Sequence, residues 1–311
     1  MRAISYDTYA PDGSLDGLHL SDLPEPKVAP GTALVAVRST SVNPVDWKLV
    51  SGALDPVFDT VFPVVPGWDV AGVVVRTGMD TPEWQAGDEV VSYARKDLLH
   101  GGTFGELVAV PATSLARKPH GLSWDEAGSL PLAGLTALRS LDLTEVGPDD
   151  VVLLHGASGG VGHLAVQIAV ARGARVLATA SERNHDFLRG LGAEPVTYGD
   201  GLEDRVRALA PGGVTVAVDY VGGVLEQSLA VLADGGRLAS IVDGGVTEHG
   251  GHHVWVRPDG AGLERLGALV DEGALRVEVQ ETFPLERAVD AMRLSAGGHV
   301  RGKVAVRVSE G

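Results

Sequence analysis

The amino-acid sequence predicts an α/β fold in which a doubly wound parallel sheet is joined to a second, β-rich domain. Strand and helix patterns alternate from residue 151 to residue 242, as is typical of a parallel sheet covered by helices. Short strand patterns broken by Pro and Gly fill the N-terminal third of the chain. The 311 residues, of which 44% are hydrophobic, suffice for two domains with buried cores.

Composition restricts the partners and the compartment that we expect. A net charge of −16 argues against a nucleic-acid partner, which needs a basic surface. The absence of cysteine excludes disulfides, thiolate nucleophiles and cysteine-based zinc sites. The N-terminal residues contain no apolar signal core, so we expect a cytoplasmic protein. Residues 151–171 carry no charged side chain, but four glycines interrupt the run, so we expect no membrane partner.

The β-rich domain is predicted from short strand patterns separated by turn residues. The segments "LVAVRSTSVNP", "VAGVVVRTG", "GDEVVSY" and "GELVAVP" have this character, which is typical of a barrel-like or sandwich domain. A further alternating strand, "RGKVAVRV" at residues 301–308, follows a helix pattern at about Leu285–Leu294. We expect this last strand to return to the first domain.

The parallel sheet is predicted from five apolar strand patterns that alternate with helix patterns. Its first strand, "VVLLH", is a continuous apolar run of the kind that is covered on both faces. The strands are predicted at residues 151–155, 174–180, 194–198, 214–220 and 236–242. Helices are predicted from Val161 to just before Gly173, and at about residues 182–190, 202–210 and 225–232.

A cluster of glycines lies between the first of these strands and its helix. Gly156, Gly159 and Gly162 end a buried strand and open a helix inside a β-α-β unit, which is the context of a dinucleotide site. Such glycines let the backbone approach a diphosphate, and the helix N-terminus supplies partial positive charge. The alternative is a purely structural turn in a glycine-rich chain. We predict a dinucleotide site, formed by Gly156, Ser158, Gly159, Gly160, Val161 and Gly162.

The residues after the second strand bear on the choice of dinucleotide. An NAD site usually has an acidic residue here that binds the ribose hydroxyls. If Ser181 and Arg183 face the ribose, with His185 nearby, they favour a 2′-phosphate and therefore NADP(H). If Glu182 turns in, NAD is favoured, although a carboxylate also suits the first turn of a helix. We predict NADP(H).

Several spaced motifs give the chain a resemblance to a known family. "SVNPVDWKLVSG", "FPVVPGWDVAGVV", "GDEVV", "PLAGLTAL" and "HGASGGVG" occur in order. With these motifs the chain resembles the medium-chain dehydrogenase/reductase superfamily, and within it the zinc-free quinone oxidoreductase and enone reductase branch. The resemblance implies a GroES-like catalytic domain at residues 1–121, with 275–311 returning to it, and a Rossmann-like domain at 122–274. It also implies NADPH use and a homodimer.

The chain departs from the zinc-dependent branch at both positions that would bind a catalytic metal. That branch has a cysteine near the position of Pro44 and Gly-His-Glu in place of Gly67, Trp68 and Asp69. Without a Lewis acid an unactivated alcohol is difficult to oxidise, whereas a conjugated acceptor spreads the developing charge. We therefore expect no metal. His249, His252 and His253 form the one other metal candidate, which we interpret as solvated loop histidines.

The resemblance also suggests residues for catalysis and the substrate pocket. Lys48 and Asn43 are candidates to hydrogen-bond the substrate oxygen, and Asn43 also to bind the cofactor. Their alternatives are a solvated lysine and a turn residue that bonds its own backbone. Tyr93 is a candidate proton or hydrogen-bond donor. The candidates to line the pocket are Asp46, Trp47 and Phe104, of which Phe104 equally suits a core.

Further cofactor contacts are predicted at strand ends and on one helix. The resemblance suggests Thr136 beside the nicotinamide ribose and Tyr198 near the adenosine phosphate, although Tyr198 also suits a plain sheet-edge aromatic. Val221, Ile241 and Val242 fall at the carboxyl ends of predicted strands, where such sites form.

The sequence therefore predicts an NADPH-dependent, metal-free oxidoreductase that transfers hydride to a quinone or an α,β-unsaturated carbonyl. One alternative is an enoyl reductase acting on enoyl thioesters or polyketides, which uses the same chemistry on a larger substrate. Another, of a different class, is an NADPH-binding sensor or structural protein with little turnover.

Overall fold

The computed structural model describes residues 1–309, which fall into two compact units. Unit 1 contains Met1–Leu132, Arg257–Gly273 and the chain from Val277 onward. Unit 2 contains Ala133–Val256 and Ala274–Arg276. Within the described residues, none of the helices combines the length and the apolarity needed to cross a bilayer.

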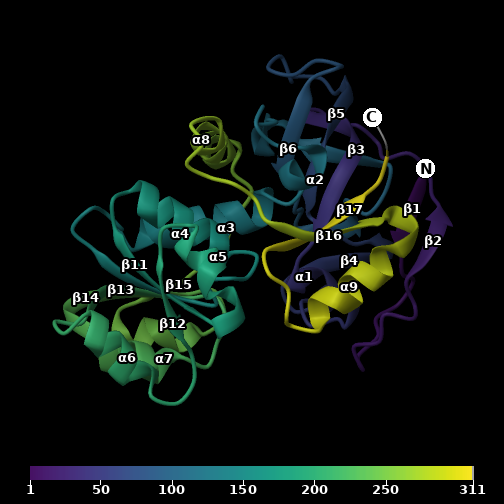
Figure 1. Cartoon of the computed structure of the whole chain (residues 1–311). Coiled ribbons are helices and arrows are strands. Elements are labelled where there is room, and N and C mark those ends of the chain that lie inside the picture. Colours follow the sequence, from purple (N-terminus) through teal and green to yellow (C-terminus); the bar gives the residue numbers. More distant parts are fainter. Residues whose placement is uncertain (310–311) are drawn as a thin grey trace. The chain divides into compact units, whose positions relative to one another are not determined.

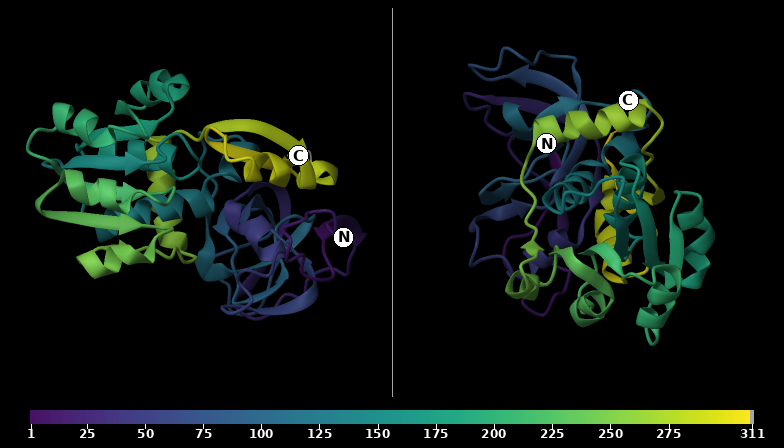
Figure 2. Two further views of the ribbon diagram at one scale, coloured as in Figure 1. Left: turned by 90° about the horizontal axis from the view of Figure 1, so that it is seen from below. Right: turned by 90° about the vertical axis from the view of Figure 1, so that its left-hand side faces the viewer.

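Unit 2 is built on a six-stranded parallel sheet with helices on both faces (Figures 1 and 2). The strand order is β12-β11-β10-β13-β14-β15. The order reverses between β10 and β13, the place where open parallel sheets bind ligands. The strands are β10 (Val151–His155), β11 (Arg175–Ala180), β12 (Glu194–Thr197), β13 (Val214–Asp219), β14 (Leu232–Ser240) and β15 (His252–His253).

The helices of unit 2 cover the sheet with apolar side chains that pack against those of the strands. Leu153 on β10 and Leu177 on β11 lie in one core cluster with Leu202 and Val206 of the helix that follows β12. Figure 1 shows α4 and α5 on one side of the sheet and α6 and α7 on the other. The helices are α3 (Pro131–Leu143), α4 (Gly162–Ala171), α5 (His185–Arg189), α6 (Leu202–Leu209) and α7 (Leu225–Val231).

The fold class predicted from the sequence is confirmed, with two local differences in unit 2. The helix expected at 182–190 is divided into a 3-10 turn, Glu182–Asn184, and α5. The division lies at Asn184, whose side chain bonds back to the preceding segment. The strand expected at 236–242 begins earlier and ends at Ser240, so Ile241 and Val242 follow its carboxyl end.

Unit 1 is built on a seven-stranded sheet that surrounds an apolar core. Its order is β16-β17-β3-β5-β6-β9, with β8 paired to β3. Alternate residues of β3, such as Ala33, Val35 and Val37, belong to the core cluster. Two smaller sheets are β1 (Arg2–Ser5) with β2 (His19–Asp22), and β4 (Asp59–Val65) with β7 (Leu98–Gly101).

The bounds of the remaining elements of unit 1 follow the chain. The strands of its large sheet are β3 (Thr32–Val42), β5 (Asp69–Thr77), β6 (Glu89–Tyr93), β8 (Leu107–Pro111), β9 (Leu115–Arg117), β16 (Val279–Pro284) and β17 (Lys303–Arg307). Its helices, besides the first residues of α3, are α1 (Pro44–Val50), α2 (Trp124–Ala127), α8 (Gly260–Asp271) and α9 (Ala288–Ala296).

The C-terminal part of the chain packs into unit 1. β17 pairs antiparallel with β3, with Val304 opposite Val42, and α9 lies along β16 and β17 (Figure 2, left). The unit boundaries differ from those predicted at 121 and 275. Residues 257–273 belong to unit 1 because α8 binds β9, where Glu264 accepts a hydrogen bond from the Arg117 N–H at 2.8 Å. Residues 122–132 are held by Asp125, which pairs with Arg307.

Candidate functional site

The glycine turn after β10 is shaped by the close approach of its own backbone. Gly156 has φ +68°, which favours glycine, and a Cβ on Gly162 would lie 2.3 Å from the Gly156 carbonyl oxygen. These two glycines are therefore required by the fold. Gly159 differs, because the nearest atom to its Cβ position is that same oxygen at 3.4 Å, an ordinary contact. The protein itself leaves room for a side chain at Gly159.

The turn presents backbone amides at the start of α4. Ser158, Gly160 and Val161 are only half-buried, and no acceptor among residues 1–309 takes a hydrogen bond from their N–H groups. Three donors at the N-terminus of a ten-residue helix form a site that favours an anion such as a diphosphate. The residues present therefore fit the phosphates of a dinucleotide.

The segment after β11 is tied to this turn by Asn184. The Asn184 amide donates to Ser158 Oγ at 3.0 Å and to Ser181 Oγ at 3.4 Å. Ser181 thus lies beside the glycine turn, as a ribose-binding role requires. Arg183 and Glu182 are both exposed in the 3-10 turn. Arg183 is therefore accessible to a 2′-phosphate, and Glu182 is equally accessible to ribose hydroxyls. Sequence analysis did not identify Asn184, because an asparagine at the start of a helix is common and gives no sign of a more distant partner.

The other residues of unit 2 predicted to contact the cofactor, apart from His185 and Thr136, follow strands at the same edge of the sheet. A Cβ on Gly156 would lie 3.4 Å from Val221 Cβ, and one on Gly222 would lie 3.0 Å from Val242 Cγ1. Tyr198, Val221 and Val242 are 60%, 58% and 50% exposed, which leaves apolar surface at the carboxyl ends of β12, β13 and β14. This edge has the surface that an adenosine or a nicotinamide would cover. Ile241 follows β14, and Thr136 is buried on α3.

Asp219 at the end of β13 fixes the loop that carries Val221. Its carboxylate accepts hydrogen bonds from the N–H groups of Val221 and Gly222, both at 2.8 Å, and from Ser240 Oγ at 2.9 Å. One side chain thereby joins the ends of β13 and β14. The signal in the sequence was an aspartate that closes an apolar strand, "VTVAVD", which sequence analysis did not single out.

A neutral histidine lies under the glycine turn. Ser228 Oγ donates to the Val224 carbonyl oxygen at 2.8 Å, so His155 Nε2, 3.0 Å from that hydroxyl, is the donor of the second bond. Burial lowers the pKa of His155 to about 4, against the opposing effect of Asp219. His155 is therefore uncharged at neutral pH, so the positive potential at the turn comes from its backbone N–H groups.

In unit 1, a buried polar network centres on Asp69. The Asp69 carboxylate accepts hydrogen bonds from Ser41 Oγ and Asn43 Nδ2, both at 2.7 Å, and from the Leu132 N–H at 2.6 Å. The Lys303 ammonium lies 3.6 Å from it and donates to Asn43 Oδ1 at 2.5 Å. The network joins α1, β5, β17 and the start of α3. It occupies both polar atoms of the Asn43 amide, leaving one N–H of that amide for a ligand.

Asp46 lies in the same interior with a perturbed acidity. It accepts a hydrogen bond from the Asn43 N–H at 2.7 Å. Burial raises the pKa of Asp46 to about 7, with a further contribution from the Asp69 charge. Burial also lowers the pKa of Lys303, against the opposing effect of both carboxylates. The buried charges of this cluster are therefore stabilised by the hydrogen bonds and the ion pair within it.

The predicted pocket and catalytic residues are distributed between the interior and the surface. Asp46 and Phe104 are wholly buried, and Trp47 is half-buried, with no hydrogen-bond partner for its indole nitrogen among residues 1–309. Lys48 is exposed on α1, and its ammonium lies 5.5 Å from the Trp47 ring. Burial, with the charges of Asp69 and Asp46, raises the pKa of Tyr93 well above its ordinary value. At neutral pH the Tyr93 phenol is therefore a donor.

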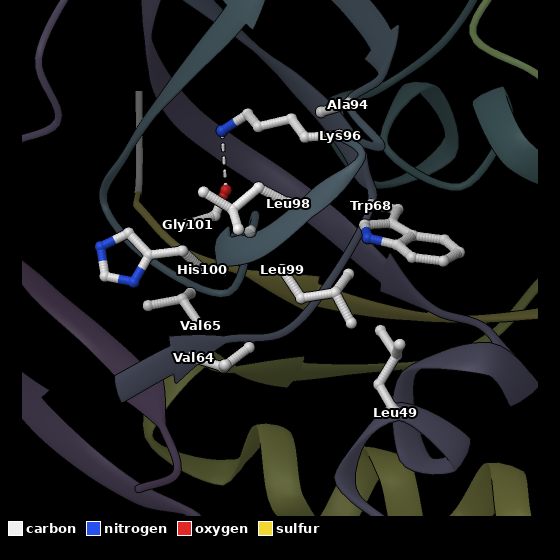
Figure 3. A pocket seen from close by; sticks show the side chains of 11 residues that line it. Leu49, Val64, Val65, Trp68, Ala94, Lys96, Leu98, Leu99, His100 and Gly101 are labelled. Carbon is white, nitrogen blue, oxygen red and sulfur yellow. Dashed lines mark hydrogen bonds between the residues drawn. The ribbon is translucent and has the colours of Figure 1, made fainter. Parts of the chain in front are cut away.

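A hollow in unit 1 lies between α1, β4 and β7 (Figure 3). The cavity inside it is about 10 Å³, which is room for about one water molecule. Trp68 forms one wall and packs edge-to-face against Tyr93 and Phe58, with 6.0 Å between ring centroids in each pair. Its lining residues are Leu49, Val64, Val65, Trp68, Ala94, Lys96, Leu98, Leu99, His100, Gly101 and Gly102.

No group of three or more His, Asp or Glu side chains within residues 1–309 is placed to hold a metal ion. Pro44 is the first residue of α1, and Trp68 belongs to the aromatic wall of the hollow. The positions that bind zinc in the zinc-dependent branch are thus taken here by a proline, an indole and the hydrogen-bonded Asp69.

We predict that Gly162→Ala and Gly159→Ala separate folding from cofactor binding. Gly162→Ala forces a methyl group against a backbone oxygen and should lower the free energy of unfolding by about 2 kcal/mol. Gly159→Ala meets no such contact, so its Tm should stay near that of the wild type while binding of a nicotinamide dinucleotide weakens about tenfold. Thermal melts measure the first effect, and fluorescence titrations with the reduced nicotinamide dinucleotides measure the second. Unchanged affinity in Gly159→Ala would contradict the assignment of this turn to the diphosphate.

We predict that Asp46→Asn changes how stability depends on pH. The pKa of Asp46 is raised in the folded chain, so its contribution to stability is complete below about pH 4 and is lost as pH rises through about 7. Asparagine keeps the acceptor for the Asn43 N–H but carries no charge. The Tm of Asp46→Asn minus that of the wild type should therefore increase from pH 5 to pH 8. The exposed Asp59, changed to Asn, is the control, and an equal, flat difference for both variants would contradict the prediction.

Comparison with known proteins agrees with this architecture. Residues 29–120 match the alcohol dehydrogenase GroES-like domain, and residues 191–306 match the zinc-binding dehydrogenase family. A chloroplast envelope quinone oxidoreductase homologue of Arabidopsis thaliana is 31% identical, with 98% of each chain covered. An NADPH-dependent alkenal/one oxidoreductase of the same plant is 33% identical over 98% of this chain and 79% of its own.

A solved structure leads to the same family. The quinone oxidoreductase from Coxiella burnetii is 35% identical, covers 99% of both chains and superposes with a TM-score of 0.87. The coverage of 99% means that the superposition extends over both units. The chain therefore belongs to the zinc-free quinone oxidoreductase branch of the medium-chain dehydrogenase/reductase superfamily, and it is an oxidoreductase of the quinone and enone reductase type.

Proposed function

We propose that the protein is an NADPH-dependent reductase that acts without a metal on quinones or α,β-unsaturated carbonyl compounds. The observation that carries the proposal is the turn at residues 156–162, where free amides at the start of α4 lie beside Ser181. When bound, NADPH supplies the hydride. The relatives named as quinone and alkenal/one oxidoreductases support a conjugated acceptor.

The preference for NADPH over NADH is assigned to the segment after β11. Ser181 is fixed next to the glycine turn by Asn184, and the Arg183 guanidinium is exposed two residues further along. A guanidinium binds a phosphate ester with two parallel, charge-assisted hydrogen bonds. A ribose hydroxyl is uncharged and has a single oxygen, so it cannot accept such a pair. Glu182 is exposed as well, at the start of the 3-10 turn, where a carboxylate is stabilised by the N–H groups.

The residues of unit 1 are proposed to position the acceptor and stabilise its oxygen. Reduction of a conjugated carbonyl moves negative charge onto that oxygen, and a donor in a water-poor site stabilises it strongly. Tyr93, which stays protonated, and Lys48 on α1 are the candidate donors. The Asp69 network holds α1 and β5 in fixed register, which orients these donors rather than reacting itself.

We predict that the enzyme oxidises NADPH in the presence of a quinone or an enone and that a chelator does not change the rate. The assay follows NADPH absorbance with 1,4-naphthoquinone, 3-penten-2-one, a crotonyl thioester and a simple aldehyde, with and without EDTA. Turnover restricted to the conjugated acceptors supports the proposal. Loss of turnover on chelation, or turnover with the aldehyde alone, would overturn it.

We predict that Arg183→Ala weakens NADPH binding about tenfold and leaves NADH binding within about twofold of the wild type. The affected group is the 2′-phosphate, which NADH lacks. Dissociation constants for both coenzymes measure the effect, and Arg189→Ala, which removes an exposed arginine of α5, is the matched control. Equal weakening for NADPH and NADH would remove Arg183 from the phosphate site.

A further inference from the structure

Asn184 joins the two loops that follow neighbouring strands of unit 2. β10 and β11 pair in parallel, and beyond their last paired residues the Ala157 N–H still donates to the Thr179 carbonyl oxygen at 3.1 Å. The glycine turn after β10 therefore lies beside the segment after β11. The Asn184 amide bridges the two, with its Nδ2 3.0 Å from Ser158 Oγ and 3.4 Å from Ser181 Oγ.

Neither Asn184 nor Ser181 caps the helical segment that follows it. Ser181 stands at the N-cap position of the 3-10 turn and Asn184 at that of α5, where both residue types commonly accept a hydrogen bond from the first turn. Here neither side chain makes that bond. By contrast, Ser123 and Asp259 do cap the helices that follow them in unit 1. Capping therefore does not explain the positions of the Asn184 and Ser181 side chains.

The direction of the hydrogen bonds follows from the chemistry of the amide. An amide nitrogen carries two N–H groups and accepts no hydrogen bond, so Ser158 Oγ and Ser181 Oγ both accept from it. Each hydroxyl keeps its own proton, for which no acceptor is found among residues 1–309. Both serines are only half-buried, so these protons are accessible to a ligand. One amide thus holds two hydroxyl groups as hydrogen-bond donors.

A ligand with two separate phosphate groups suits this pair of donors. Ser158 belongs to the glycine turn, whose N–H groups at Ser158, Gly160 and Val161 also find no acceptor in the described chain. Ser181 precedes the exposed Arg183 by two residues. A phosphate oxygen is charged and accepts a stronger hydrogen bond from a hydroxyl than an uncharged oxygen does.

We propose that Asn184 is a positioning residue for the coenzyme, which holds Ser158 as a donor to the diphosphate and Ser181 as a donor to the 2′-phosphate. The inference rests on the proposed function and identifies a residue that determines its preference for NADPH. Asn184 acts through the two serines and not through a contact of its own. Its loss therefore weakens binding of both coenzymes through Ser158, and weakens binding of NADPH further through Ser181.

A double-mutant cycle on coenzyme binding tests the role assigned to Ser181. The measured quantity is the selectivity, defined as the Kd of NADH divided by the Kd of NADPH, from calorimetric titrations without an acceptor. Ser181→Ala should lower the selectivity about tenfold, because a charge-assisted hydrogen bond to the 2′-phosphate is lost. Asn184→Ala should lower it about threefold or more. The double variant should have the selectivity of Ser181→Ala alone, and a further fall would contradict the proposal.

A second cycle, with NADH alone, tests the role assigned to Ser158. NADH has the diphosphate but lacks the 2′-phosphate, so Ser181 does not contribute to this measurement. Asn184→Ala and Ser158→Ala should each weaken NADH binding about threefold or more. The double variant should bind NADH as Ser158→Ala does, whereas additive losses would show that Asn184 does not act through Ser158.

Two further variants separate the positioning role from a general disturbance of the fold. Asn184→Asp keeps the size of the side chain but replaces the N–H donors by an acceptor, so both serine hydroxyls turn toward it. Its selectivity should fall at least as far as that of Asn184→Ala, and unchanged selectivity would overturn the assignment. Gln227→Ala removes a half-buried amide of α7 in the same unit and should leave both Kd values unchanged. Thermal melts confirm that each variant is folded.

The outcomes separate this inference from the proposed function. If the wild type oxidises NADPH with 1,4-naphthoquinone and Asn184→Ala keeps the wild-type selectivity, the inference is wrong and the proposed function stands. If the wild type binds NADPH no more tightly than NADH, the proposed function fails, and the role of Ser181 fails with it. The NADH cycle then decides the role of Asn184 at the diphosphate, which non-additive losses support and additive losses overturn.

Discussion

The close packing of Gly162 against the Gly156 carbonyl is the constraint on which the site of unit 2 depends. It forces the chain to turn sharply at the end of β10 and to begin α4 with N–H groups that find no acceptor among the described residues. Because the six strands are parallel, their carboxyl ends meet at this edge, and the loops after β11, β13 and β14 are collected around the turn. The anion site and its apolar surroundings follow from that one backbone geometry.

Unit 1 buries ionisable side chains of both signs in its interior. The Asp69 carboxylate is satisfied by three hydrogen bonds and by the Lys303 ammonium, so this charge stabilises the junction of α1, β5 and β17. Asp46 and Lys96 have fewer hydrogen bonds to stabilise their charges. Burial therefore raises the pKa of Asp46 and lowers that of Lys96, and in both cases the neutral form is favoured. Asp69 and Lys303 are therefore structural groups, which hold the start of α1 against β5 and β17.

The sequence predicted the parallel sheet and the glycine turn because both depend on local patterns. "VVLLH" followed by spaced glycines specifies a buried strand, a turn and a helix within a few residues. The Asp69 network was not predicted, because it joins residues separated by up to 260 positions, such as Asn43 and Lys303. Asn184 was missed for a related reason, since the role of this amide depends on its hydrogen bond to Ser158, 26 positions earlier in the chain.

The most direct measurement of the central claim is a crystal structure of the protein grown with NADPH. The account predicts that the diphosphate accepts hydrogen bonds from the N–H groups of the turn at residues 158–161 and that the 2′-phosphate contacts Arg183. Clear coenzyme density at another place, with the amides of this turn facing solvent, would contradict it.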